Sequence, residues 1–231
     1  FLLERLPLGS CLARFICRAG VDLGFVSQEL HRRFTALCGA APETWGARSS
    51  IEPAPLDEAV FRRVDPAGRR AARQRLGVHG AAVLAAGRLV PIKGFDLLLL
   101  AVARIPLASR PRLLIAGTGP EAERLQRLAQ ACAVDLRLLG TLGHADLADW
   151  MMAADVFVHP CRRLPDGRQE GAPLVVREAL ALGVPVIASA LGGIPDLAGR
   201  EGLTLIPADH GQLLTQEIGA ALPRSVTRAA D

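Results

Sequence analysis

The sequence has no tyrosine, and all its aromatic residues together make up only 4% of 231 residues. Proteins that bind single-stranded nucleic acid stack bases on aromatic side chains, so this chain offers little of the surface they use. Lys and Arg exceed Asp and Glu by a formal charge of +4. We therefore expect no nucleic-acid partner, and the mild basic excess suits a phosphate-bearing ligand or an acidic membrane surface equally well.

Cysteine and histidine are too few and too scattered to predict a metal site. The five cysteines are odd in number and none stands in a C-x-x-C pair, so neither a disulfide framework nor a zinc site is indicated. The five histidines show no spacing typical of a metal cluster or a His-based catalytic triad. We expect no metal, and free thiols fit a reducing compartment such as the cytoplasm.

Long apolar runs are also missing. The longest, Leu97 to Val102, lies between Asp96 and Arg104 and is far shorter than a membrane span. The first residues lack the pattern of a secretory signal, and the chain opens with Phe1, which suggests a truncated start. The expected location is cytoplasmic, with peripheral association with the inner face of the membrane as an alternative.

From residue 81 onward, short apolar runs alternate with helical patterns. The runs are typical of buried strands and cover Ala81–Ala86, Arg112–Ala116, Leu136–Gly140, Val156–Pro160, Val184–Ala188 and Leu203–Ile206. The helical patterns cover Gly94–Ile105, Glu121–Cys132, Ala145–Ala153, Leu174–Leu182 and Gln212–Leu222. Because apolar strands that alternate with helices are typical of a parallel sheet covered on both faces, the sequence predicts a doubly wound α/β domain.

The residues before this domain predict a smaller, mainly helical unit. Leu2–Arg18 reads as a helix or two, Val21–Ser27 as a short strand and Gln28–Cys38 as a helix. From Gly39 to Pro55 the pattern dissolves into Gly, Ala, Pro and Ser without a period, which is typical of a linker. We place the domain boundary there, dividing the chain into residues 1–51 and 52–231, with a helix over Asp65–Leu76 leading into the sheet.

Two carboxylates stand out in the segment QEGAPLVVREALALGVPVIASALGG. Glu170 lies in a turn beside Gly171, and Glu178 lies inside the following apolar helix. A buried carboxylate is costly unless something binds it, so Glu178 requires a partner. An internal Lys or Arg is one candidate, and a ligand with paired hydroxyls is the other.

The turns that follow the predicted strands are where a ligand is expected in such a sheet. These turns hold Gly87, Arg88 and Lys93 after the first strand, Gly117 and Gly119 after the second, and Thr141 and Leu142 after the third. Glycines let the backbone approach a ligand closely. Two cations flanked by glycines at a strand end suit a diphosphate, although ordinary surface charges are the alternative.

One of these turns also fits a competing motif. GTGPEA, residues 117–122, matches G-x-G-x-x-A between a strand and a helix, which is the dinucleotide fingerprint. That fingerprint expects an acid at the end of the next strand, whereas Asp135 stands at its beginning. A nicotinamide or flavin enzyme is therefore the weaker interpretation.

Four segments stand out in order along the chain: GRLVPIKG, LLIAGTGPEAERL, LRLLGTLGHADLADWMMAADVFVHPC and EGAPLVVREALALGVPVIASALGGIPDL. Together they resemble the C-terminal, donor-binding half of group 1 glycosyltransferases, a retaining family (family four) with the GT-B fold. The resemblance covers about residues 81–207, and the loop DGRQEGAP followed by GGIPDL is similar to members that build bacterial exopolysaccharides and capsules. It implies a Rossmann-like donor domain preceded by a remnant of the acceptor domain.

The same resemblance implies roles for the marked residues. Glu170 and Glu178 match the E-x7-E pair, which contacts the donor sugar and the ribose diol, while Arg88 and Lys93 match the family's diphosphate-binding cations. The catalytic set is then Glu170, Arg88 and Lys93. The donor would also meet Gly87, Gly117, Gly119, Thr141, Leu142, Gly171, Ala172 and Leu174. No cofactor or metal is implied, because the chain has no Asp-x-Asp pair to hold one.

The function expected from this resemblance is retaining transfer of a sugar from a nucleotide diphosphate sugar to a glycan or lipid-linked saccharide, in bacterial polysaccharide biosynthesis. A nucleotide-sugar epimerase of the same architecture and a non-catalytic sugar-nucleotide-binding module are the alternatives. The family's linker reads close to IPNGVD, whereas this chain has IEPAPLDEAVF. Since most of an acceptor domain and the C-terminal helical region are also absent, we expect this chain to bind donor without transferring sugar.

Overall fold

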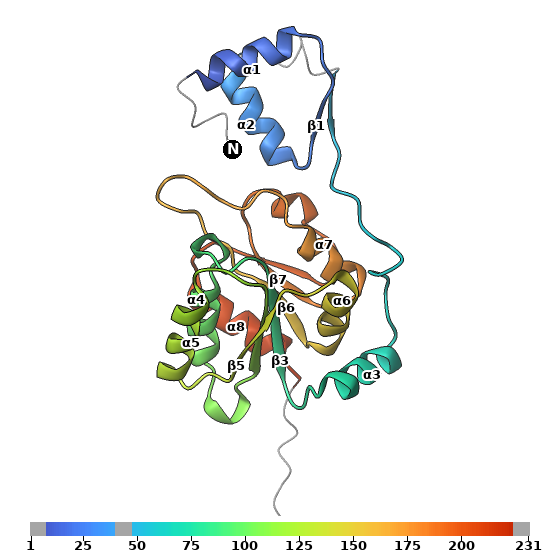
Figure 1. Ribbon diagram of the computed structural model, residues 1–231, viewed down its shortest axis with the longest axis vertical. Helices are drawn as coiled ribbons and strands as arrows, with labels where there is room; N and C mark the ends of the chain where they lie inside the picture. Colours follow the sequence, from blue (N-terminus) through green and yellow to red (C-terminus); the bar gives the residue numbers. More distant parts are fainter. Residues whose placement is uncertain (1–7, 40–47, 224–231) are drawn as a thin grey trace, which may run out of the picture.

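The computed structural model describes residues 8–39 and 48–223, which form a small N-terminal unit and a larger α/β domain (Figure 1). The small unit contains helices α1 (Gly9–Arg18) and α2 (Gln28–Cys38) and strands β1 (Leu23–Phe25) and β2 (Ser49–Ile51). The two strands pair in parallel, with Leu23 opposite Ser49. A core of its own holds this unit together, made of Ala13, Phe25, Phe34 and Cys38.

Strand β2 corrects the expectation of an unstructured linker over Gly39–Pro55. Its three residues are Ser49, Ser50 and Ile51, too short and too polar to show a strand period. The hydrogen bonds that make it a strand come from β1, which lies more than twenty residues earlier in the chain. The expected boundary after residue 51 falls where β2 ends, and residues 40–47 lie outside the described part of the chain.

The larger domain is a parallel sheet of six strands in the order β5-β4-β3-β6-β7-β8. Its strands are β3 (Ala82–Ala86), β4 (Arg112–Ala116), β5 (Leu136–Gly140), β6 (Val156–His159), β7 (Val186–Ser189) and β8 (Leu203–Ile206). Its α-helices are α3 (Pro66–Leu76), α4 (Phe95–Ala103), α5 (Ala122–Ala131), α6 (His144–Ala153), α7 (Leu174–Ala181) and α8 (Gly211–Ala221). Short 3-10 turns lie at Pro91–Lys93, Leu107–Ser109 and Ile194–Leu197.

Helices cover both faces of this sheet, as the sequence predicts (Figure 1). Alternate residues of β3 face opposite sides, so Leu84 packs in the core beneath α3, α6 and α7. Its neighbour Val83 packs in the core beneath α4, α5 and α8. Because both faces are buried, every residue of β3 is apolar and buried.

The Asp155 side chain links the two central strands, β3 and β6, at their amino ends. β3 and β6 pair in parallel, and just before β6 the Asp155 Oδ2 accepts a hydrogen bond from the Ala82 N–H at 2.8 Å. The Asp155 N–H donates to the Ala82 carbonyl at 2.9 Å. Arg73 on α3 also contacts Asp155, at 3.2 Å, so one acid joins β3, β6 and α3.

The predicted strand over Val184–Ala188 begins too early. The Val184 N–H donates to the Ala179 carbonyl at 3.0 Å, so this residue still terminates α7. Pro185 follows and has no N–H to donate to a neighbouring strand. The strand therefore begins at Val186 and runs on to Ser189.

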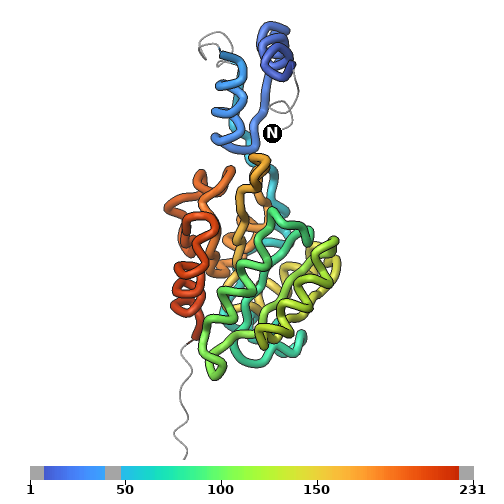
Figure 2. The backbone as a smooth tube through the Cα atoms, turned by 90° about the vertical axis from the view of Figure 1, so that its left-hand side faces the viewer, coloured from blue at the N-terminus to red at the C-terminus, as the bar shows by residue number. Residues whose placement is uncertain are grey.

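The N-terminal unit lies beyond the carboxyl ends of the strands (Figure 1), and Figure 2 shows it set apart from the larger domain. The Gln28 N–H at the start of α2 donates to the Asp196 carboxylate of the larger domain at 2.7 Å. In the small unit Phe25 is buried, whereas Phe15 on α1 is 68% exposed. Within residues 8–39 and 48–223, no helix is both long and apolar enough to cross a membrane.

Candidate functional site

The loops at the carboxyl ends of β3 and β4 touch each other through their backbones. Gly117 has φ +133°, and a Cβ on it would lie 2.0 Å from the Gly87 carbonyl oxygen. A Cβ on Gly119 would lie 2.5 Å from the Leu89 carbonyl oxygen. The sequence suggested that these glycines admit a ligand, and the structure shows that each of them admits a neighbouring loop.

The loop that carries Lys93 is fixed against the loop after β6. Gly94 has φ +65°, and a Cβ there would lie 2.0 Å from the Pro160 carbonyl oxygen. Two residues after Pro160, the Arg162 N–H donates to the Ile92 carbonyl at 3.0 Å. These contacts hold Lys93, which follows β3, next to Glu170, which lies between β6 and α7.

Lys93 and Glu170 form an ion pair at this edge, through Nζ and Oε2. Their side chains are 17% and 18% exposed. Burial raises the pKa of Glu170, but Lys93 outweighs it by charge and hydrogen bonding, so the pKa of this carboxyl lies below its ordinary value. The Gly171 N–H donates to Oε1 of the same carboxylate at 3.3 Å. Glu170 is therefore a carboxylate, pre-oriented by a cation and a backbone amide.

His159 and Cys161 complete this cluster, and sequence reasoning missed them. Both are buried, with His159 Nε2 3.0 Å from Cys161 Sγ. Burial and the Lys93 charge lower the pKa of His159 to about 3, so the ring is neutral at neutral pH. Burial also raises the pKa of the Cys161 thiol.

The signal that could have found the pair is H-x-C at a strand end, since residues two apart on extended backbone point to the same side. The ligand atoms of His159, Cys161 and Glu170 all lie within 4.8 Å of one another. These residues could hold a metal, and the expectation that no such cluster exists rested on spacing along the chain alone.

Glu178 on α7 is 3% exposed, and no residue in the described part of the chain donates a hydrogen bond to it or pairs with it. Burial raises its pKa, and the charge of His144 offsets only part of this effect. Of the two partners proposed from the sequence, an internal Lys or Arg is therefore absent from the described residues. The need for a partner remains.

The amino end of α7 lies next to Glu170 in the chain. Pro173 is the N-cap and supplies no side-chain cap, so α7 begins at Leu174, as the sequence predicts. Within the described residues, the N–H groups of Ala172, Leu174 and Val175 donate to no acceptor. Free N–H groups at a helix start favour an anion.

The other predicted site residues occupy the same edge in different ways. Arg88 is exposed and makes no ion pair with any described residue. The Thr141 hydroxyl lies 3.4 Å from that of Thr118, while Leu142 packs against the core. Two further polar atoms, Gln169 Oε1 in the loop before α7 and Ser189 Oγ at the end of β7, are buried without a hydrogen-bond partner among the described residues.

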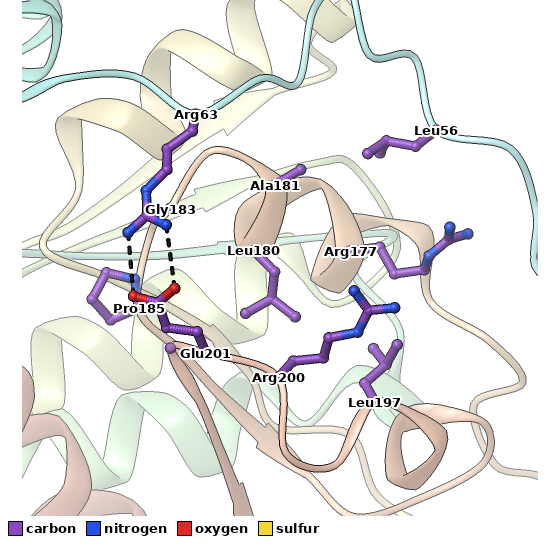
Figure 3. Close-up of a pocket in the computed structure, with 11 residues that line it drawn as sticks. Leu56, Arg63, Arg177, Leu180, Ala181, Gly183, Pro185, Leu197, Arg200 and Glu201 are labelled. Carbon is purple, nitrogen blue, oxygen red and sulfur yellow. Dashed lines mark hydrogen bonds and ion pairs between the residues drawn. The ribbon is translucent and has the colours of Figure 1, made fainter.

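A cavity of about 490 Å³ lies elsewhere (Figure 3). It is lined by Leu56, Arg63, Arg177, Leu180, Ala181, Gly183, Pro185, Leu197, Arg200, Glu201 and Gly202. Two of these lining residues, Arg63 and Glu201, form an ion pair, and their side chains are 70% and 82% exposed. None of the predicted site residues lines it, and we place the chemistry at the strand ends because the buried, oriented carboxylates lie there.

A family model described as Glycosyl transferases group 1 matches residues 80–223. The chain is 36% identical, over 199 residues, to the Corynebacterium glutamicum GDP-mannose-dependent monoacylated alpha-(1-6)-phosphatidylinositol monomannoside mannosyltransferase, covering 83% of this chain and 50% of that protein. It is 37% identical, over 183 residues, to the D-inositol 3-phosphate glycosyltransferase of Mycobacterium bovis, covering 75% of this chain and 34% of the relative. The chain thus spans about half or less of the length of these curated relatives.

Solved structures show the same fold. A structure of Anabaena HepE in complex with UDP superposes with a TM-score of 0.78 at 24% identity, covering 95% of this chain and 58% of that one. WaaG, a glycosyltransferase involved in lipopolysaccharide biosynthesis, superposes with a TM-score of 0.73 at 22% identity, covering 96% and 60%. Both likenesses extend over the N-terminal unit as well as the sheet.

Proposed function

The chain belongs to the group 1 glycosyl transferases, and on that premise we propose that its α/β domain binds the donor of a retaining glycosyltransferase. The reaction moves a sugar from a nucleotide diphosphate sugar to a glycan or lipid-linked acceptor. Residues 52–231 form the donor-binding part, and residues 1–51 belong to the acceptor side. Since this chain spans half or less of each relative, the complete reaction is proposed for the whole protein and not for this chain alone.

The observation that carries this proposal is the buried carboxylate of Glu178, which has no partner among residues 8–39 and 48–223. A buried acid without a hydrogen bond destabilises a domain, so its presence at the ligand edge of the sheet calls for a donor from outside the described chain. The paired hydroxyls of a ribose supply two such donors. Arg88 and the free N–H groups at the start of α7 lie at the same edge and suit the phosphates.

These groups act on the bond that breaks. As the sugar leaves the diphosphate, negative charge grows on the departing phosphate, where Arg88, Lys93 and the free N–H groups at the start of α7 oppose it. Glu170 orients the sugar through its hydroxyls. Two side-chain cations meet the charge that a metal ion would otherwise balance, so we propose that transfer needs no metal.

The relatives suggest which ligands to try first. The name of the Corynebacterium glutamicum relative specifies GDP-mannose as donor and a phosphatidylinositol monomannoside as acceptor. We therefore propose GDP-mannose as the first donor to test and a lipid-linked acceptor, in place of the exopolysaccharide acceptor expected from the loop sequence. Cytoplasmic location, with or without membrane association, remains part of the proposal.

A paired experiment tests this function. GDP, UDP, GDP-mannose and UDP-glucose are each titrated into the purified chain by calorimetry, and a labelled form of the tightest donor is then incubated with a lipid extract. Diphosphate-dependent binding supports the proposal, whether or not sugar is transferred. Epimerised donor would identify the epimerase alternative instead, and binding of none of the four would contradict a donor site.

A further inference from the structure

Three different metal-binding side chains meet beside the ion pair, and the proposed reaction uses only one of them. His159 Nε2 lies 3.0 Å from Cys161 Sγ. Glu170 Oε2 lies 3.7 Å from that sulfur and 3.8 Å from His159 Nε2. An imidazole nitrogen, a sulfur and a carboxylate oxygen therefore form one compact triangle.

This triangle has the size of one face of a zinc tetrahedron. Zinc bonds of about 2.0 to 2.3 Å at tetrahedral angles place neighbouring ligand atoms about 3.3 to 3.6 Å apart. The observed separations of 3.0, 3.7 and 3.8 Å straddle that interval. We propose that the chain binds Zn²⁺ through His159, Cys161 and Glu170, with Lys93 displaced from the Glu170 carboxylate.

The backbone holds two of the three ligands ready. His159 ends β6, and the segment Pro160–Arg162 is held against the Lys93 loop by the Arg162 to Ile92 hydrogen bond and the close approach of Gly94. His159 and Cys161 are buried, whereas Glu170 is 18% exposed. Metal enters from the side of Glu170 and Lys93, and a water completes the tetrahedron there.

Binding rearranges charge without any redox change. The Cys161 thiol gives its proton to solvent as its sulfur joins the metal, and the Lys93 ammonium leaves Glu170 as the metal takes its place. If the proposed function holds, the metal occupies the carboxylate that orients the donor sugar, so Zn²⁺ competes with the sugar nucleotide. The site is then inhibitory, in keeping with a reaction that needs no metal.

Co²⁺ titration followed by the absorption of the thiolate–cobalt bond tests the site without any nucleotide. The chain contains a rival pair of thiols, Cys17 and Cys38, whose sulfurs lie 3.1 Å apart. Parent chain is therefore compared with Cys161→Ala, Cys17→Ala and Cys132→Ala. We expect Cys161→Ala alone to remove the band. A band that survives Cys161→Ala, or disappears in Cys17→Ala, would overturn the proposal.

Two further variants keep the test decisive if Cys161→Ala does not fold. Glu170→Gln changes a part-exposed carboxylate and should weaken Zn²⁺ binding at least about a hundredfold. Lys93→Ala removes the competing cation and should strengthen it at least about tenfold. Weaker metal binding in Lys93→Ala would contradict the proposal that the metal displaces Lys93 from Glu170. It would mean that the ion pair only stabilises the structure of the cluster.

Competition with nucleotide is measured separately. Sugar-nucleotide affinity is determined with and without saturating Zn²⁺, and again in Cys161→Ala as the matched control. We expect Zn²⁺ to lower the affinity of the parent at least about tenfold and to leave the variant unchanged. If no nucleotide binds at all, the proposed function fails while the cobalt titration still decides the metal site.

Discussion

Lys93 Nζ contacts Glu170 Oε2, although the two residues lie 77 positions apart. Lys93 is expected to bind the donor diphosphate, and Glu170 the donor sugar. Without a donor, the two side chains bind each other. The pair keeps both charges compensated in a part-buried site, where an isolated charge would be costly. Donor binding must therefore exchange this contact for new ones.

Replacing Arg88 tests the diphosphate role most cleanly, because Arg88 is exposed and unpaired within the described residues. Arg88→Ala should weaken nucleoside diphosphate binding by about 1 to 3 kcal/mol, the contribution of a hydrogen bond to a charged group. Nucleoside binding should hardly change. Calorimetry checks both, with Arg70→Ala on α3 as control; equal losses for nucleoside and diphosphate would contradict the assignment.

Lys93→Ala should cost more diphosphate affinity than Arg88→Ala, because it also leaves the Glu170 carboxylate uncompensated beside the phosphates. The double variant Lys93→Ala/Glu170→Gln removes that repulsion. It should recover about 1 kcal/mol relative to the single variant, the scale of coupling between contacting residues. Additive losses in this double-mutant cycle would show that the pair does not share a ligand.

Glu178→Gln should stabilise the free chain at neutral pH and weaken ligands that carry a ribose diol. The folded-state pKa of Glu178 is raised by burial, so folding loses stability as pH rises from below the unfolded-state pKa to above the folded one. Gln carries no such penalty. Urea unfolding should therefore show the variant more stable above this window and equal to the parent below it.

The exposed Glu123, whose side chain is 85% exposed, provides the matched control as Glu123→Gln, which should show no such window. Ligands whose ribose is 2′,3′-dideoxy should bind parent and Glu178→Gln alike. If Glu178→Gln were instead less stable than the parent, and the parent bound dideoxy and ordinary ligands equally, Glu178 would serve the fold and not a ligand.

Asp96→Asn should lower stability at neutral pH. Burial raises the pKa of Asp96, but Arg162 at 2.9 Å and Arg124 at 3.1 Å pull it below its ordinary value. The stabilisation is present above the unfolded-state pKa and disappears as pH falls through the folded one. We expect a loss of about 1 to 3 kcal/mol at pH 7 that vanishes in acid. Asp146→Asn, at the equivalent turn of α6, should lose only a few tenths.

Gly117→Ala should destabilise the domain by at least about 2 kcal/mol, since a Cβ there overlaps the Gly87 carbonyl in addition to a strained φ. Gly77 has a positive φ of +64° with nothing within 4 Å. Gly77→Ala should therefore cost only about 1 kcal/mol. Urea unfolding of both variants separates the loop contact from the backbone strain, and equal losses would contradict the contact.

Much of the larger domain was predictable because its signals are local and repeated. Strands Arg112–Ala116, Leu136–Gly140 and Leu203–Ile206 match the structure to the residue, as does helix Gln28–Cys38. Their apolar runs are continuous, and turn residues bound them. Strand β2 was not predicted, because its hydrogen bonds come from β1 and the residues Ser49–Ile51 carry no strand pattern of their own.

The site was predictable in its charged residues and hidden in its neutral ones. Glu170, Arg88 and Lys93 stand out because charges between glycines at strand ends are uncommon in a core-forming segment. His159 and Cys161 look ordinary in sequence. Folding brings them to Glu170. The structure also shows that the glycines of one loop contact the backbone of the next, and that Glu178 has no hydrogen-bond partner among the described residues.

The hydrogen bond from Ala82 to Asp155 joins residues 73 positions apart, and it has a consequence for synthesis of the chain. While residues up to β5 emerge from the ribosome, β3 can pair with β4, but its other side stays open until β6 has been made. An open edge of a buried, all-apolar strand invites pairing with the wrong partner. Chains halted between β5 and β6 should therefore aggregate or recruit chaperones, whereas chains extended past β8, which completes the sheet, should not.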